Sequence, residues 1–260
     1  MRCSNSYNYF SIMDIENLKD VIVIEKDELA LGYRYEPEAR ELNGITVCSY
    51  EYDLPDLLKK YTFFPCNPQI GDVYAKSPFY ENVYISICDY RAHVVQSKSR
   101  CMSNVARLLG ATSYHSKIVL GKFTERKWTV GVGVEYKSVE GVGDITQEIQ
   151  DSLKIKSEVN MTYETKGVTQ ADYDDARQQA EQYRLSTNPN IVTLLEQRNP
   201  QSSSLLKSMN VNVSLSEEVN RSLDVAFRLN AMAGVFKLSS DFNLSLKKRY
   251  DITEMIEINF

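Results

Sequence analysis

The sequence has little of the chemistry that most enzymes and metalloproteins carry. Its 260 residues include two histidines, His93 and His115, and one tryptophan. It has no GxxxxGK[ST], HExxH or GxSxG motif, which are typical of phosphate-binding loops, zinc peptidases and α/β-hydrolases. The GxG pieces of VGVGVEY and EGVGD lie in a strand-like run and a turn, and a dinucleotide fingerprint needs a strand on one side and a helix on the other. We therefore predict no cofactor, no metal site and no catalytic residue.

The five cysteines lack the spacing of a zinc site or of a disulfide framework. Their number is odd and no two form a CxxC pair. Cys48, Cys66, Cys88 and Cys101 are therefore expected to be small buried side chains in a reducing compartment. Cys3 is a candidate for lipidation, because it lies two residues from the start, and a single acyl chain gives only marginal membrane affinity.

Long apolar runs are missing as well. No stretch reaches the roughly 20 apolar residues of a membrane-spanning helix, and the first residues lack the apolar core of a signal peptide. The predicted location is cytoplasmic, with peripheral membrane attachment as an open extension. The net charge of −5 disfavours nucleic acid as a partner. Lys247, Lys248 and Arg249 form a small basic cluster, a candidate contact for an anion or a lipid headgroup.

Residues 1–110 have the pattern of a mixed α/β part. Apolar runs predict strands, a proline at a first turn predicts a short helix, and helical spacing ending at Gly110 predicts a longer helix. The predicted strands cover 21–26, 44–54 and 81–95, and the predicted helices 54–61 and 97–109. Both histidines then fall within strand-like segments.

Residues 111–260 follow a period of two, interrupted by a helical insert at 168–200. Alternation predicts antiparallel strands with one apolar face. These strands are expected at 113–123, 127–139, 153–165, 209–216 and 222–229. Within the insert, Thr169 stands three residues before Asp172 as an approximate capping box. The blocks 113–165 and 208–260 are expected to pair into one sheet.

The closing run, 236–260, alternates for longer than an ordinary strand. A hairpin turning at 247–251 is the first interpretation, and unusually long strands are the second, because the turn lacks Gly or Asn-Gly. Ser240, Lys248 and Glu254 interrupt the apolar face. Glu254 is interpreted as the wet edge of a sheet that packs on protein.

The predicted fold class is α+β, with an antiparallel β-rich C-terminal part that contains long amphipathic hairpins and an inserted helical pair. Its apolar parity gives a candidate interaction face, which comprises Trp128, Val130, Val132, Val134, Phe242, Leu244 and Leu246. A cysteine at position 3 and long alternating hairpins are similar to the bacterial gasdermin-type pore formers. The similarity covers these two features and no specific motif, so no family is assigned.

Three classes of function remain open. We favour a non-enzymatic interaction or assembly protein, whose one-sided sheet packs on other copies, as a homo-oligomer, or on a protein partner. The second class is a membrane-acting pore former whose amphipathic hairpins form a β-barrel, since several runs reach the about 9–11 residues that a barrel strand needs. The third is an enzyme with an unrecognised site. Assembly is preferred because an apolar face that contains Glu254 suits protein packing better than lipid.

Overall fold

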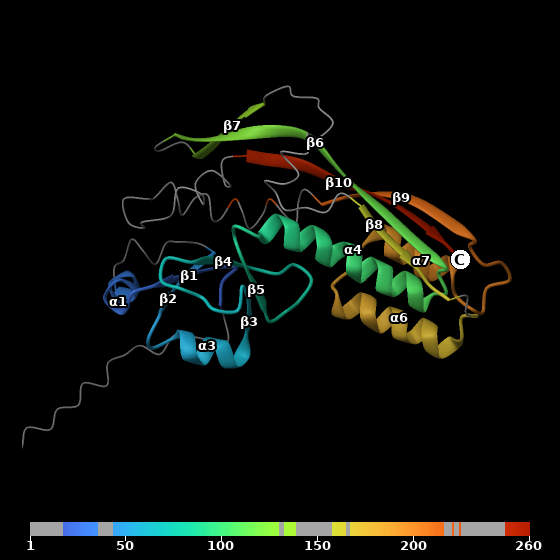
Figure 1. Ribbon diagram of the computed structural model, residues 1–260, viewed down its shortest axis with the longest axis horizontal. Helices are drawn as coiled ribbons and strands as arrows, with labels where there is room; N and C mark the ends of the chain where they lie inside the picture. The colour runs from blue at the N-terminus through green and yellow to red at the C-terminus, as the bar shows by residue number, and fades with distance from the viewer. Residues whose placement is uncertain are drawn as a thin grey trace, which may run out of the picture.

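The described residues of the protein form an α+β fold with two five-stranded sheets. The computed structural model describes residues 18–35, 44–129, 133–138, 158–164, 167–215, 220, 224 and 248–260. One sheet is mixed and comes from the N-terminal part, and the other is antiparallel and comes from the C-terminal part (Figure 1). The predicted fold class, including the antiparallel C-terminal sheet, is confirmed.

Sheet A is built from short strands in the order β2-β1-β4-β5-β3. Its strands are β1 (Val21–Glu25), β2 (Ile45–Ser49), β3 (Thr62–Phe64), β4 (Val73–Lys76) and β5 (Val83–Ser86). Two pairs are parallel, β1 with β2 and β3 with β5, while β4 runs antiparallel to both of its neighbours. The run VIVIE is buried at all five positions, as expected for a strand that is covered on both faces.

Two short helices accompany sheet A. Helix α1 (Asp27–Tyr35) follows β1 directly, and α3 (Leu54–Lys60) follows β2. In α3 a proline occupies the first turn, where a missing N–H costs no helical hydrogen bond. Leu54 and Leu57 are the buried residues of this helix, which confirms the predicted helical turns.

Helix α4 (Tyr90–Leu108) is the long central helix, and thirteen of its nineteen residues are buried. It lies beneath sheet B and contacts β5, β6 and α6 (Figure 1). Its end matches the expectation, since Gly110 has φ of +82°, which a residue with a side chain rarely adopts. The predicted strand 81–95 is wrong beyond Ser86. The helix begins at Tyr90, because apolar Val94 continues the helical spacing of Cys101 and Val105 toward the N-terminus.

Sheet B contains the long strands of the molecule, in the order β7-β6-β10-β9 with β8 also on β6. Its strands are β6 (Ser113–Thr129), β7 (Gly133–Ser138), β8 (Glu158–Thr162), β9 (Ser208–Ser214) and β10 (Lys248–Asn259). Every pairing is antiparallel. β10 pairs with β6 on one side and with β9 on the other, so the two predicted β blocks do form one sheet.

The helical insert lies between β8 and β9 in sequence. Helix α6 (Gln170–Gln182) begins with the predicted capping box, because the Thr169 hydroxyl accepts from the Asp172 backbone N–H and the Asp172 carboxylate accepts from the Thr169 N–H. Helix α7 (Pro189–Gln197) is capped by the Asn188 side chain. Both helices bury a narrow apolar stripe, which in α6 consists of Ala176 and Ala180.

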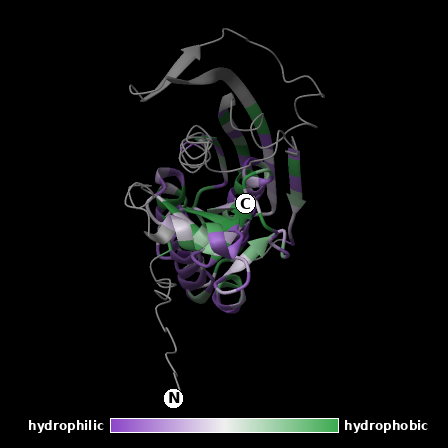
Figure 2. Ribbon diagram, turned by 90° about the vertical axis from the view of Figure 1, so that its left-hand side faces the viewer, coloured by the Kyte–Doolittle hydropathy of each residue, from purple (hydrophilic) through white to green (hydrophobic). Residues whose placement is uncertain are grey.

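The hydrophobic core has two parts that share sheet A. Val21 and Val23 of β1 belong to the larger part, together with α4, α6, α7 and the inner side of sheet B. Ile22 and Ile24 belong to the smaller part, which includes Leu57 of α3. In Figure 2 the green, hydrophobic segments gather toward the middle of the fold, and the purple, hydrophilic ones lie mostly around them. Alternate residues of one strand thus enter two different cores.

Three predictions about the C-terminal strands are wrong. The segment 127–139 is not one strand, because Trp128 of β6 pairs with Val134 of β7. The predicted hairpin turn at 247–251 is also wrong, because the described residues of this segment, 248–251, belong to β10, whose register with β6 shifts between Tyr250 and Ile252. Asp224, the one described residue of 222–229, is helical rather than extended.

The long-strand alternative is therefore the correct one for the described strands. β6 has 17 residues and β10 has 12. Residues 236–247 of the closing run lie outside the described residues.

Candidate interaction surface

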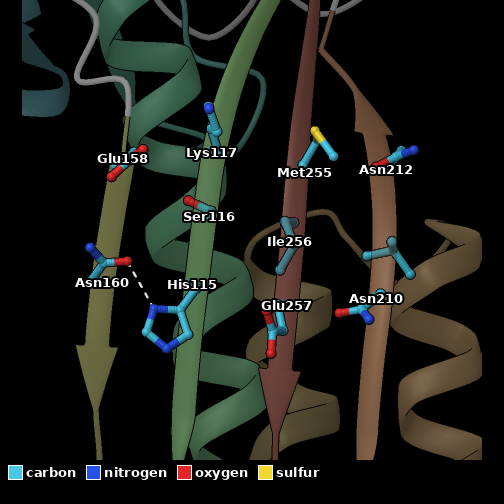
Figure 3. Close-up of a pocket in the computed structure, with 11 residues that line it drawn as sticks. His115, Ser116, Lys117, Glu158, Asn160, Asn210, Asn212, Met255, Ile256 and Glu257 are labelled. Atoms are coloured by element: carbon cyan, nitrogen blue, oxygen red, sulfur yellow. Dashed lines mark hydrogen bonds between the residues drawn. The ribbon is translucent and has the colours of Figure 1, made fainter.

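The outer face of sheet B carries a group of exposed polar side chains. Strands β8, β6, β10 and β9 lie side by side here, and helices pass behind them (Figure 3). The alternation of each strand sends one set of side chains inward and the other outward. Together the outward side chains line a shallow groove of about 590 Å³.

Strand register arranges these side chains in two rows across the sheet. The first row is Asn160, His115, Glu257 and Asn210, and the second row is Glu158, Lys117, Met255 and Asn212. Each row therefore carries cationic or imidazole, anionic and amide groups within one cross-strand line (Figure 3).

Hydrogen bonds between neighbouring strands hold several of these side chains in place. His115 Nδ1 lies 2.8 Å from Asn160 Oδ1. The Asn259 amide donates to the Ser113 hydroxyl at 3.1 Å and to Glu257 Oε1 at 3.2 Å. Cross-strand contacts of this kind contribute a few tenths to about 1 kcal/mol each. The outer face is thus an ordered polar surface of mixed charge.

The groove does not combine His115 with a nucleophile. Ser116 follows it in sequence, but its hydroxyl is buried on the opposite face and lies 3.1 Å from the Ser99 hydroxyl. No cysteine lines the groove. The geometry suits recognition of another polar surface better than nucleophilic chemistry, which needs a base within hydrogen-bond reach of the attacking atom.

The inner face of the same strands packs on α4 through a polar seam inside the apolar core. The Tyr114 hydroxyl donates to Glu254 Oε1 at 3.4 Å, and it lies 3.5 Å from the Ser99 hydroxyl of α4. Glu254 is fully buried, and its Oε2 has no hydrogen-bond partner among the described residues. Burial raises the pKa of Glu254, against the opposing influence of the nearby Ser99 and Ser116 hydroxyls and of the Lys98 cation.

The prediction that Glu254 marks a wet edge is therefore wrong. The carboxyl group lies at the sheet–helix interface, on the parity of Ile252 and Ile256, which are exposed by 0% and 2%. The alternate apolar side chains of β10 therefore cover the protein's own core. The side chains of β10 that remain accessible are those of the outer face.

The two outer edges of this sheet are formed by β9 on one side and by β8, beside β7, on the other. In β9, Phe260 N–H donates to Lys207 O, and Leu215 N–H donates to Ile252 O. Hydrogen-bonded pairs alternate in an antiparallel ladder. The residues between these pairs, which are Ser208, Asn210, Asn212 and Ser214, therefore direct their backbone N–H and C=O groups away from β10.

The same argument applies to β8. Tyr163 N–H donates to Thr112 O, which fixes the phase of the β6–β8 ladder. Glu158, Asn160 and Thr162 then direct their backbone groups away from β6. Among the described residues, no strand pairs with the outer side of β8 or of β9.

The structure places only some of the predicted site residues. Trp128 and Val134 are backbone register partners in the β6–β7 pair, and Lys248 and Arg249 are register partners of Glu125 and Thr124 at the start of β10. The remaining ones lie outside the described residues, namely Cys3, Val130, Val132, Phe242, Leu244, Leu246 and Lys247.

Histidine and cysteine positions differ from those expected. His93 lies on α4 rather than in a strand, and its Nδ1 is 3.1 Å from the Ser97 hydroxyl. Cys48 and Cys101 are buried as predicted, whereas Cys66 and Cys88 are exposed in loops. Burial raises the pKa of the Cys101 thiol to about 11, so this sulfur is a poor nucleophile at neutral pH.

The outer-face rows were not predicted from the sequence, because the apolar positions of these strands carry the period of two. The signal was present in the alternate positions of MNVNVS and EVNMT, where asparagines recur opposite apolar residues. Their partners, His115 and Glu257, are distant in sequence, and only the register brings them into one row.

No helix in the described ranges is both long and apolar enough to cross a membrane. Those ranges also contain no group of three or more His, Cys, Asp or Glu side chains placed to hold a metal ion. Comparisons with protein families, with curated proteins and with solved structures found no match to this chain.

Proposed function

We propose that the protein is a non-enzymatic assembly protein, in which copies join through the β8 and β9 edges of sheet B. The observation that carries the proposal is that Asn210 and Asn212 of β9 and Asn160 of β8 direct backbone groups outward, where no described strand pairs with them. An open strand edge is a template for another strand, because every outward N–H and C=O can gain a partner.

The composition of these edges supports pairing. β9 reads SMNVNVS and contains no charged residue, proline or glycine, and β8 reads EVNMT with one charge. Edge strands that avoid association commonly carry lysine, proline or a bulge. Neither β8 nor β9 has a lysine or a proline, and their registers with β6 and β10 are continuous.

Strand directions favour a head-to-tail arrangement. The order β8, β6, β10, β9 is antiparallel throughout, so β8 and β9 run in opposite directions. A second copy in the same orientation would therefore bring its β8 antiparallel to β9, which extends the sheet without reversing it. Interfaces of this kind close into rings or continue as filaments.

Side chains at the two edges are also complementary. Val211 and Met209 of β9 are half-buried on the inner side, as are Val159 and Met161 of β8, so pairing would cover apolar surface that is now partly exposed. On the outer side Asn210 would meet an asparagine or glutamate of the neighbouring β8. Amide side chains pair well across strands without repulsion between like charges.

Sedimentation velocity over about a hundredfold range of protein concentration tests the proposal. We expect a concentration-dependent assembly that Asn210→Pro abolishes, because proline removes an outward N–H without breaking a bond to β10. Asn210→Thr is the matched control, since threonine keeps the N–H and favours strands. Asn160→Pro and Asn160→Thr form the same pair in β8.

The outcomes distinguish head-to-tail pairing, a two-fold dimer through β9 and the absence of edge pairing. Loss of assembly in both proline variants supports head-to-tail pairing, and loss in Asn210→Pro alone supports a two-fold dimer through β9. A wild-type protein that stays monomeric at every concentration, or equal assembly in all variants, overturns edge pairing.

Membrane action is the second candidate, because β6 and β10 exceed the length of about 9–11 residues that a membrane-spanning strand needs. The described outer side chains of these strands are mostly polar, with Val119 and Met255 as exposed apolar exceptions, and the inner ones already cover the core. Insertion would therefore require the sheet to leave α4. Dye release from anionic liposomes that a charge at Leu244 or Val132 abolishes would support it, and no release at micromolar protein would exclude it.

A further inference from the structure

A second pocket lies away from sheet B, between α4 and the loops that flank β3 and β5. Its volume is about 250 Å³. Phe64, Tyr80 and Val83 form its apolar wall, and α4 supplies its polar side. None of these residues belongs to the β8 or β9 edge of sheet B.

Four polar side chains of α4 face this pocket. His93, Gln96, Ser97 and Arg100 are spaced at i, i+3, i+4 and i+7, so they share one face of the helix. Of these, Ser97 is buried and lies against His93, while Gln96 and Arg100 are exposed. The helix therefore lines the pocket with donors at several depths.

Arg100 gives the pocket a positive charge. Its guanidinium forms no ion pair with any side chain in the described ranges, where the nearby Glu81 is engaged by Arg184 at 3.3 Å. The Gln96 amide likewise has no hydrogen-bond partner among the described side chains. An anion entering the pocket would gain a charge-assisted hydrogen bond that the protein itself leaves unmade.

His93 lies beside this cation on the same helix face. Burial, and after it the Arg100 charge, lowers the pKa of His93. Its ring contacts the Phe64 ring, with the centroids 5.0 Å apart and the planes at 46°. The tilted imidazole and phenyl rings form one wall of the pocket, and Phe64 remains 45% exposed.

We propose that this pocket binds a small organic oxyanion with a flat apolar body, whose charged end contacts Arg100 and Gln96 and whose body packs on Phe64 and Tyr80. The volume lies just below the roughly 300–1,000 Å³ of ligand sites for larger molecules, which limits the body to about one ring. Aromatic walls favour stacking of a planar group. Carboxylate and phosphoryl ends share the chemistry that a guanidinium recognises.

Titration by ligand-observed NMR and calorimetry with benzoate and phenyl phosphate tests this binding. Benzamide serves as the uncharged probe and inorganic phosphate as the probe without a body. We expect both aryl anions to bind. Both comparison probes should bind at least about tenfold more weakly, which is the effect expected from the loss of one charge-assisted hydrogen bond. The better of the two anions identifies the preferred charged group.

Variants link the binding to the pocket. Arg100→Gln should weaken benzoate or phenyl phosphate at least about tenfold, and Phe64→Ala should weaken both probes. Arg107→Gln is the matched control, because Arg107 is exposed on the same helix and does not line the pocket. Absence of binding to the wild-type protein at about 10 mM probe, equal binding of benzamide, or equal affinities in Arg100→Gln and Arg107→Gln would overturn the proposal.

Discussion

The two sheets of this protein differ in the length of their strands and in the number of their covered faces. Sheet A has short strands, and its central strand β1 places alternate residues in two different cores. Sheet B has long strands with one face on the core and one in solvent. The difference shows why an apolar run such as VIVIE and an alternating run such as ITEMIEINF belong to one chain, since each pattern follows from the number of covered faces.

Their edges differ as well. Sheet A ends in β3, which has three residues and is followed directly by Pro65. Short strands and proline both limit further pairing. Sheet B ends in β9, which has seven residues and neither proline nor charge. The other edge of sheet A is the five-residue β2, so the contrast in edge length is between β3 and β9. The following changes test the difference between the two sheets.

The largest loss of stability is expected in sheet A. Ile22→Ala removes a side chain with no exposed area from the smaller core, so the free energy of unfolding should fall by about 2–5 kcal/mol. Urea denaturation followed by circular dichroism measures the change. A loss of less than about 0.5 kcal/mol would mean that β1 is not covered on both faces.

The second largest loss of stability is expected at Arg198, which holds the segment before β9. Arg198 donates through Nε to Leu109 O at 3.0 Å and through its η nitrogen to Leu206 O at 2.9 Å, while its guanidinium stacks on the Phe260 ring. Arg198→Ala would leave two carbonyls without this donor and should cost about 2–3 kcal/mol.

Arg198→Lys is the matched control, because lysine keeps the charge but cannot reach both carbonyls in the same geometry. It should lose part of this stability. Equal unfolding free energies for wild-type, Ala and Lys proteins would show that β9 is held by its ladder alone.

Glu254→Gln tests the polar seam on the inner face. Unlike the substitutions above, it should increase the free energy of unfolding. Because the pKa of buried Glu254 is raised, the folded protein binds the proton more tightly than the unfolded chain, and stability falls as pH rises from the unfolded pKa through the folded one. Glutamine removes this dependence, so the variant should gain on the order of 1 kcal/mol at neutral pH and little under acid conditions.

Denaturation of wild-type and Glu254→Gln proteins at several pH values checks the sign. Glu257→Gln is the control, since Glu257 lies on the same strand but on the exposed face. A variant that is less stable than wild type at neutral pH would show that the charged carboxylate stabilises the seam.

The smallest effect is expected on the outer face. Met255 is 47% exposed between Lys117 and Asn212, so Met255→Ala should change the free energy of unfolding by about 0.5 kcal/mol or less. The comparison with Ile22→Ala then measures how differently the two sheets use their side chains. A loss above about 2 kcal/mol would mean that another part of the protein covers this face.

Local patterns predicted much of the fold. The buried run at Val21, the proline of α3, the Thr169 cap and the Gly110 helix end all act within a few residues, and each was confirmed. The pairing of the two β blocks followed from their shared period of two. Most of these features are determined by residues that are close together in the sequence, so the sequence alone is enough to predict them.

Features that depend on distant contacts were not predicted. The start of α4 near Tyr90 was missed, because Val83–Ser86 and the first turn of α4 both carry apolar residues at spacings that fit a strand. Glu254 was assigned to a wet edge, since neither Tyr114 nor Lys98 is near it in sequence. The row of His115 and Glu257 and the pocket of His93 and Arg100 likewise need the folded register and packing.

The central claim is that the outward N–H groups of β9 pair with another copy, and amide hydrogen exchange at Asn210 and Asn212 tests it most directly. The account predicts exchange that slows as protein concentration rises, while the inward N–H groups of Val211 and Val213 stay protected throughout by β10. Rapid exchange at Asn210 and Asn212 at every concentration, with the protein shown to be assembled, would contradict it.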